Sequence, residues 1–131
     1  MNGKPTIDTN VIIYAFGQHD DERKETAKEI ITKCNIISVQ VVNEAVYVLM
    51  RKFKFQLQEI DQFIQFVKKK FIVSNLNLQV LEHTLKISDQ CGFSFWDSMI
   101  IAAALENHCN ILYTEDLQPN RVIEGRLEII N

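Results

Sequence analysis

Short apolar segments alternate with longer amphipathic segments along almost the whole chain, and this alternation limits the possible folds more than any other feature. Five apolar segments read as β-strands: residues 5–8, 35–39, 71–76, 110–116 and 126–130. The intervening segments are predicted helices: residues 11–16, 21–34, 41–53, 58–70, 78–91 and 94–109. Strands separated by helices of this length predict an α/β fold with three layers, α/β/α, around a central parallel sheet.

The chain is short enough to form one domain, which we expect to span residues 1–131. With four glycines and two prolines, the sequence contains no linker and no low-complexity segment. The odd number of cysteines (Cys34, Cys91 and Cys109) and their spacing favour neither disulfides nor a zinc site. No signal segment is evident, and no apolar stretch approaches the roughly 20 residues that cross a bilayer. We therefore expect a cytoplasmic protein with no membrane partner.

The net charge of −3 argues against a protein that holds nucleic acid by bulk electrostatic attraction. It is compatible with a protein that holds divalent cations on clustered acids. Asp8 is a first indication of such a cation-binding protein. It lies inside an apolar run, where a carboxylate is costly unless it is paired, hydrogen-bonded or bound to a metal.

Two acids are expected at one edge of the sheet. Asp8 ends the first predicted strand, and Asp116 ends the predicted strand 110–116. In open parallel sheets, ligands bind beyond the carboxyl ends of the strands. These two side chains are therefore predicted to face one another at the binding edge.

Two further acids begin or interrupt apolar helix faces. Asp97 shares its helix face with Ile100 and Ile101, and Glu44 lies in a segment with few other polar groups. Four inward-facing carboxylates near element ends would repel one another and raise each other's pKa values. Oxygen-only ligands suit Mg²⁺ or Mn²⁺, so the sequence predicts a site for such a cation.

Each acid also has a purely structural interpretation. Asp8 is in position to cap the following helix, and Ser94 stands three residues before Asp97, as in a capping box. Glu44 would be a surface residue if its helix were rotated, and Asp116 would suit a turn. His19 and His83 lie in polar surroundings and are expected to be exposed, whereas the cysteines, Trp96 and the phenylalanines are mainly assigned to the core.

Three blocks of sequence are similar to a known family. "IDTNVIIYAF", "NEAVYVL" and "SFWDSMIIAAALENHCNILYTEDLQ" resemble, in the same order, the sequence blocks of PIN-domain proteins. The closest likeness is to the VapC-type toxins of bacterial toxin–antitoxin pairs. The likeness spans nearly the whole chain, and "FWDSMIIAAA" followed by "ILYTEDL" is its most specific part.

The resemblance implies a PIN-like fold and a metal-dependent endoribonuclease that hydrolyses RNA phosphodiester bonds. The family's acidic positions fall on four residues of this chain: Asp8, Glu44, Asp97 and Asp116. Asn10 and Thr114 match polar helpers that position an acid or a water. The resemblance also implies a homodimer and a cognate antitoxin whose tail enters the active site.

The chemistry of the acids suggests how such an enzyme would work. One or two Mg²⁺ or Mn²⁺ ions would lie among Asp8, Asp97 and Asp116, with Glu44 as a further ligand or as a group that orients water. The basic residues after Glu44 are candidates for guiding the RNA backbone: Arg51, Lys52 and Lys54.

Two other functions fit parts of the sequence. A phosphatase of the haloacid-dehalogenase type would use Asp8 as a nucleophile, but it needs a second aspartate where this chain has Asn10. A non-catalytic RNA- or protein-binding domain on the same fold would use its acids as caps and turns. It would present an apolar face at Phe63, Phe66 and Phe71, and it predicts no stabilisation by Mn²⁺.

Overall fold

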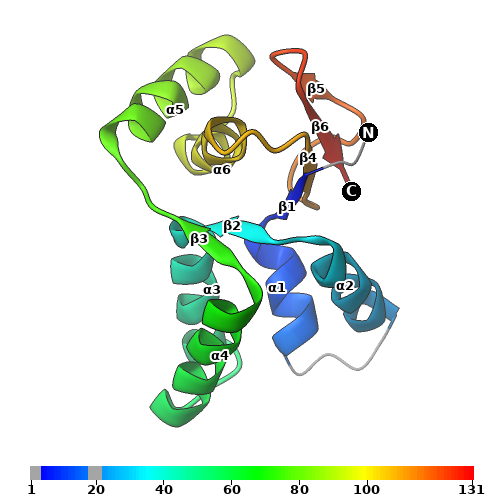
Figure 1. Ribbon diagram of the computed structural model, residues 1–131, viewed down its shortest axis with the longest axis vertical. Coiled ribbons are helices and arrows are strands. Elements are labelled where there is room, and N and C mark those ends of the chain that lie inside the picture. The colour runs from blue at the N-terminus through cyan, green and yellow to red at the C-terminus, as the bar shows by residue number, and fades with distance from the viewer. Residues whose placement is uncertain (1–3, 18–21) are drawn as a thin grey trace.

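The computed structural model of the protein describes residues 4–17 and 22–131. Its larger sheet has four strands in the order β1 (Pro5–Ile7), β4 (Ile111–Tyr113), β6 (Leu127–Ile130) and β5 (Val122–Ile123). The first three are parallel, and β5 pairs antiparallel with β6. A smaller parallel sheet pairs β2 (Ile36–Ser38) with β3 (Ile72–Ser74). The two sheets meet where β1 and β2 lie side by side (Figure 1).

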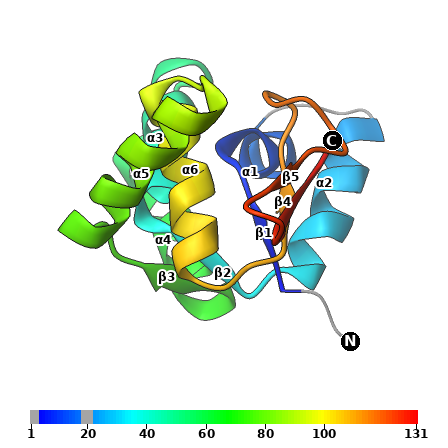
Figure 2. The same ribbon diagram turned by 90° about the horizontal axis from the view of Figure 1, so that it is seen from above.

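Six helices are described around these strands: α1 (Thr9–Phe16), α2 (Glu22–Lys33), α3 (Val39–Arg51), α4 (Leu57–Lys70), α5 (Leu78–Cys91) and α6 (Phe95–Glu106). Figure 2 shows α5 and α6 on one side of the larger sheet and α2 on the other, and α1 packs against α2. The helices α3 and α4 pack beside the smaller sheet (Figure 1). This arrangement confirms the predicted three-layer α/β/α fold.

The structure differs from the predicted single sheet in two ways. First, β2 and β3 form a separate sheet from β1, β4, β6 and β5. A side-chain bond joins the two sheets at their junction, where the Thr6 hydroxyl of β1 donates to the Ile36 carbonyl of β2 at 2.8 Å. The strand β5 was not predicted. It forms because Glu124 and Gly125, both with positive φ, turn the chain back on itself to give an antiparallel pair.

Short polar residues start the helices that follow β1 and β2. The Asp8 carboxylate accepts the Thr9 backbone N–H at the start of α1, and Ser38 accepts from the Val41 N–H at the start of α3. Gly92, in the left-handed conformation, ends α5 at the predicted residue. The first two caps place the N-terminal ends of α1 and α3 at the carboxyl ends of β1 and β2.

The aromatic residues are divided between core and surface. Phe63 and Phe71 are buried, and Phe16 makes edge-on contacts with Phe63 and Phe66. Two of the three residues of the apolar face expected for a binding domain are therefore core, and Phe66 is half-buried against it. Conversely, Trp96 is 57% exposed, so its assignment to the core was wrong. It lies in the first turn of α6, whereas the buried part of that helix begins at Ser98.

No helix among the described residues is long and apolar enough to cross a membrane.

Candidate active site

Asp8 is the most buried of the candidate acids. It follows β1 directly, is 3% exposed, and its backbone N–H donates to the Tyr113 carbonyl of β4 at 2.9 Å. One carboxylate oxygen accepts the Thr9 N–H at 2.6 Å, and the other accepts the Thr114 hydroxyl at 2.7 Å. The Asp8 side chain therefore caps α1 and also belongs to the candidate site.

Burial changes the acidity of Asp8. The pKa of this carboxyl is raised from 3.8 to about 6, chiefly by burial and in smaller part by the negative charges of Asp116 and Glu44. The hydrogen bonds from Thr114 and Thr9 act in the opposite direction without offsetting the burial. Asp8 is thus an ionisable group whose environment disfavours its charge and supplies hydrogen-bond donors, but no side-chain cation among the described residues that line the cleft.

Asp116 lies beyond the end of β4, three residues after its last strand residue, Tyr113. Its backbone N–H donates to the Thr114 hydroxyl at 3.1 Å, and its carboxylate accepts from the Asn10 side-chain amide at 2.9 Å. Thr114 therefore connects Asp8 to Asp116, and Asn10 holds the latter from α1. Unlike the expected inward-facing acid, Asp116 is exposed, because the chain leaves the sheet at this point.

Glu44 lies on α3 and is half-buried, as the predicted orientation of this helix requires. One of its oxygens accepts the Thr9 hydroxyl at 2.9 Å, and the other accepts the Gln40 side-chain amide at 3.0 Å. Sequence reasoning did not single out Thr9 or Gln40. The signal for Gln40 was available, since it stands one helical turn before Glu44.

Asp97 lies in the first turn of α6 and is half-buried. Its backbone N–H donates to the Ser94 hydroxyl at 3.1 Å, so Ser94 caps the helix as the sequence suggested. Burial raises the pKa of Asp97, and the charges of Asp116 and Glu44 raise it further, while a hydrogen bond with Ser94 lowers it. Asp97 therefore belongs to the capped first turn of α6 and also lies near the other acids of the cleft.

The four acids line one cleft of about 410 Å³ at the carboxyl ends of β1 and β4. Tyr47 and Trp96 also line it. No lysine, arginine or histidine among the described residues lines this cleft. The acids come from four segments of the chain, which are the β1–α1 junction, α3, α6 and the loop after β4.

The donor chemistry of the cleft suits a hard divalent cation, because its charged groups are all carboxylates and their neighbours are hydroxyls and amides. In the arrangement shown by residues 4–17 and 22–131, no three acidic, histidine or cysteine side chains are grouped so as to hold a metal ion. The fit is therefore one of donor type and charge, and a bound cation would have to draw the carboxylates closer together.

The candidate basic residues do not enter the cleft. Arg51, at the end of α3, lies over the Tyr47 ring, 5.5 Å from its centroid. Lys52 and Lys54 follow the helix and are exposed. None of these three lines the cleft, so the acids receive no counter-charge from them.

The cysteines have the structural character expected of them. Cys34 and Cys109 are buried and Cys91 is half-buried, and all three are free thiols. Burial raises the pKa of Cys34 to about 11 and also raises that of Cys109, so both thiols stay protonated at neutral pH.

The prediction that His83 is exposed was wrong, while His19 lies outside the described residues. The His83 side chain is only 11% exposed. Its two ring nitrogens lie 2.7 Å from a Glu106 oxygen and 2.9 Å from a Glu124 oxygen. Glu124 comes from the turn between β5 and β6, far along the chain, and for this reason local sequence gave no sign of the contact.

Comparison with known proteins identifies the family and the fold. The family model for the PIN domain matches residues 6–124. A toxin–antitoxin complex from Klebsiella pneumoniae is similar in structure, with a TM-score of 0.70 and 17% identity over 98% of this chain and 97% of that one. VapBC2 from Rickettsia felis, bound to a DNA fragment from its promoter, is similar with a TM-score of 0.66 and 18% identity over 97% and 98%. No curated protein matches the sequence significantly.

The family match covers most of the chain and includes all four cleft acids. PIN domains are generally nucleases, that is, hydrolases that act on nucleic acid. On the evidence of this match and of the shared fold, the chain belongs to the PIN domain family.

Proposed function

We propose that the protein is a Mg²⁺- or Mn²⁺-dependent endoribonuclease that serves as the toxin of a toxin–antitoxin pair. One observation carries the proposal: four carboxylates from four segments line a single cleft that has no basic side chain among its described lining residues. Asp8, Asp97 and Asp116 would hold the cation, and Glu44 would be a further ligand or would orient water. When bound, the cation lowers the pKa of a coordinated water and neutralises charge that develops on the scissile phosphate.

The surrounding residues hold the acids in place. Thr114 fixes one oxygen of Asp8 and the backbone of Asp116, and Asn10 fixes the Asp116 carboxylate. Thr9 donates its backbone N–H to Asp8 and its hydroxyl to Glu44. These bonds set the direction of carboxylate oxygens before substrate arrives, which reduces the reorganisation needed for catalysis.

Asp8 is poorly placed for the phosphatase alternative. A covalent nucleophile needs an accessible oxygen, whereas Asp8 is 3% exposed and both of its oxygens accept hydrogen bonds. Each oxygen keeps a second lone pair that is available to a cation, whereas attack on phosphorus needs an oxygen that is free to approach the phosphate.

Two features support the proposed toxin role and antitoxin partner. The resemblance of the sequence blocks is closest to VapC-type toxins, and both similar structures are described as complexes of a toxin with its antitoxin or as VapBC. We further propose that the protein acts in the cytoplasm as a homodimer, as the resemblance implies.

The direct test is cleavage of a mixture of tRNA and ribosomal RNA by the purified protein with Mn²⁺, with Mg²⁺ and with EDTA. We expect discrete fragments that require the metal and that disappear with Asp8→Asn. The Glu115→Gln variant is the matched control, because Glu115 is the exposed neighbour of Asp116 but does not line the cleft. Cleavage that survives both EDTA and Asp8→Asn would contradict the proposal.

A further inference from the structure

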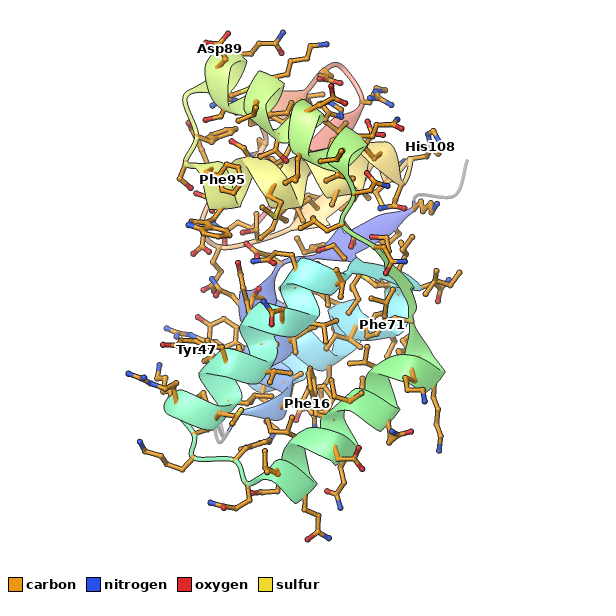
Figure 3. All side chains as sticks on the ribbon, turned by 90° about the vertical axis from the view of Figure 1, so that its left-hand side faces the viewer. Phe16, Tyr47, Phe71, Asp89, Phe95 and His108 are labelled. Atoms are coloured by element: carbon orange, nitrogen blue, oxygen red, sulfur yellow. The ribbon has the colours of Figure 1, made fainter. Side chains whose placement is uncertain are left out.

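Two large aromatic side chains form part of the wall of the acidic cleft and stay exposed. Trp96, on α6, is 57% exposed, and Tyr47, on α3, is 61% exposed. Both line the same cleft as the four acids, although they lie on different helices. Figure 3 shows Tyr47 and Phe95, the neighbour of Trp96, on the same edge of the molecule.

The fold provides partners for only part of these rings. Phe95 meets Trp96 in a T-shaped contact, with ring centroids 5.2 Å apart and planes inclined by 81°. Arg51 lies over Tyr47. A large exposed aromatic surface is costly in water, and exposed rings gathered at a cleft commonly mark a binding surface.

The electrostatics of the cleft make such a surface useful. Its acids repel the phosphates of RNA, and the described residues that line it include no basic side chain. The net charge of −3 adds no general attraction. Stacking of a base on an aromatic ring does not depend on the charge of the site, and every base offers a face for it.

We propose that Trp96 and Tyr47 stack on unpaired nucleobases of the RNA that flank the scissile bond. This inference rests on the proposed nuclease function, since it concerns the same cleft. Bases within a duplex are stacked on one another and are not free to stack on a protein ring. Arg51, held against Tyr47, is placed to contact the phosphate next to a base stacked there.

The chain offers an internal probe, because Trp96 is its only tryptophan. We would titrate the Asp8→Asn protein, in Mg²⁺, with a short single-stranded RNA of mixed sequence and follow tryptophan fluorescence. Stacking predicts saturable quenching by the single strand and much weaker quenching by the same strand annealed to its complement. Quenching equal for the two forms, or absent while a labelled single strand binds, would overturn the proposal.

Substitutions separate stacking from other effects. With labelled RNA followed by anisotropy, Trp96→Ala and Tyr47→Ala should each weaken the Kd by about tenfold, equivalent to about 1.4 kcal/mol. Trp96→Phe and Tyr47→Phe should largely restore binding, because they keep an aromatic face. The control is Leu85→Ala, which removes an exposed apolar side chain that does not line the cleft. Equal affinity of the alanine variants and the wild type would contradict the proposal.

A second copy of the chain is the competing occupant of these rings. In that case, tryptophan fluorescence would change with protein concentration, the alanine variants would sediment as smaller species, and RNA would cause no quenching; this result would overturn the proposal. The test is also separable from the proposed function. Quenching of Asp8→Asn by single-stranded RNA, beside a wild-type protein that cleaves no RNA, would leave the stacking in place and contradict the nuclease. Metal-dependent cleavage by the wild type, with no quenching of Asp8→Asn while labelled RNA binds, would contradict the stacking and leave the nuclease in place.

Discussion

The molecule contains two groups of acidic side chains that differ in their counter-charge. In the cleft, Asp8 and its three neighbours receive hydrogen bonds from hydroxyls, amides and backbone N–H groups, but no cation among the described residues lines the cleft. At the other site, which we call the His83 cluster (His83, Glu106, Glu124 and Arg126), the carboxylates contact basic side chains.

The acidity of the carboxyls follows this difference. The pKa values of Asp8 and Asp97 are raised, chiefly by burial. The pKa of Glu124 is lowered, first by its hydrogen bond with His83. Among the described residues, the cleft acids receive no counter-charge from the chain, and the proposed cation would supply it.

The largest contrast is expected when the same substitution is made in both groups. Glu44→Gln should reduce RNA cleavage by about a hundredfold, because it removes a charge that the cation requires. Glu106→Gln makes the same change in the His83 cluster and should leave cleavage per folded molecule unchanged. Initial rates measured beside circular dichroism of each variant check both, and a similar loss in the two would erase the distinction.

Stability should depend on pH through Asp8 when metal is absent. Its pKa of about 6 in the folded chain exceeds its ordinary value of 3.8, so the folded state binds more protons between these values. The free energy of unfolding should therefore fall as pH rises from about 4 to about 6, by roughly 2–3 kcal/mol for this group.

The Asp8→Asn variant isolates the ionisation, since an amide has nearly the same size as a carboxylate and cannot ionise, although its nitrogen cannot accept one of the two hydrogen bonds that the carboxylate accepts. Urea unfolding in EDTA should show that the free energy of unfolding of the variant, relative to that of the wild type, is higher at pH 7 than at pH 4.5. A gap between the two proteins that is equal at both values would show that Asp8 ionises freely in the fold.

His83→Ala should lower the free energy of unfolding by about 1 kcal/mol, because it removes a largely buried side chain that bonds one oxygen of Glu106 and one of Glu124, while Gln79 and Arg126 still donate to the other oxygen of each. Cleavage per folded molecule should not change. The Glu82→Ala variant, at an exposed neighbouring position of the same helix, is the control. If His83→Ala and Glu82→Ala unfold at the same urea concentration, the cluster contributes nothing to stability.

Arg126→Ala should have the smallest effect, no more than about 0.5 kcal/mol. Its bond to Glu124 measures 3.1 Å, but its side chain is 50% exposed, and such ion pairs are screened by water. Thermal unfolding at low and high salt would check this, and a loss as large as that of His83→Ala would mean that Arg126 supplies the main counter-charge.

Much of the site followed from the sequence because it depends on local rules. Asp8 and Asp116 come after parallel strands that proved to be neighbours, and the carboxyl ends of neighbouring parallel strands meet at one edge. The orientation of Glu44 followed from helical periodicity. The cap at Ser94 was visible in its spacing from Asp97.

The features that sequence reasoning missed depend on contacts between distant segments. His83 meets Glu124 only because β5 turns back along β6, and neither the strand nor the turn has a strong local signal. Trp96 was assigned to the core on residue type alone, yet it lies in the first turn of α6, where the helix emerges beside the cleft. Residue type predicts average burial, whereas the position within an element decides the actual burial.

The central claim is that the cleft takes a divalent cation as its missing counter-charge, and direct Mn²⁺ binding tests it best. We would titrate metal-free wild type, Asp8→Asn and Glu106→Gln with Mn²⁺ in a calorimeter. The account predicts that wild type and Glu106→Gln bind Mn²⁺ with the same Kd and that Asp8→Asn binds at least about tenfold more weakly. Wild-type protein that binds no Mn²⁺, or equal binding by all three proteins, would contradict it.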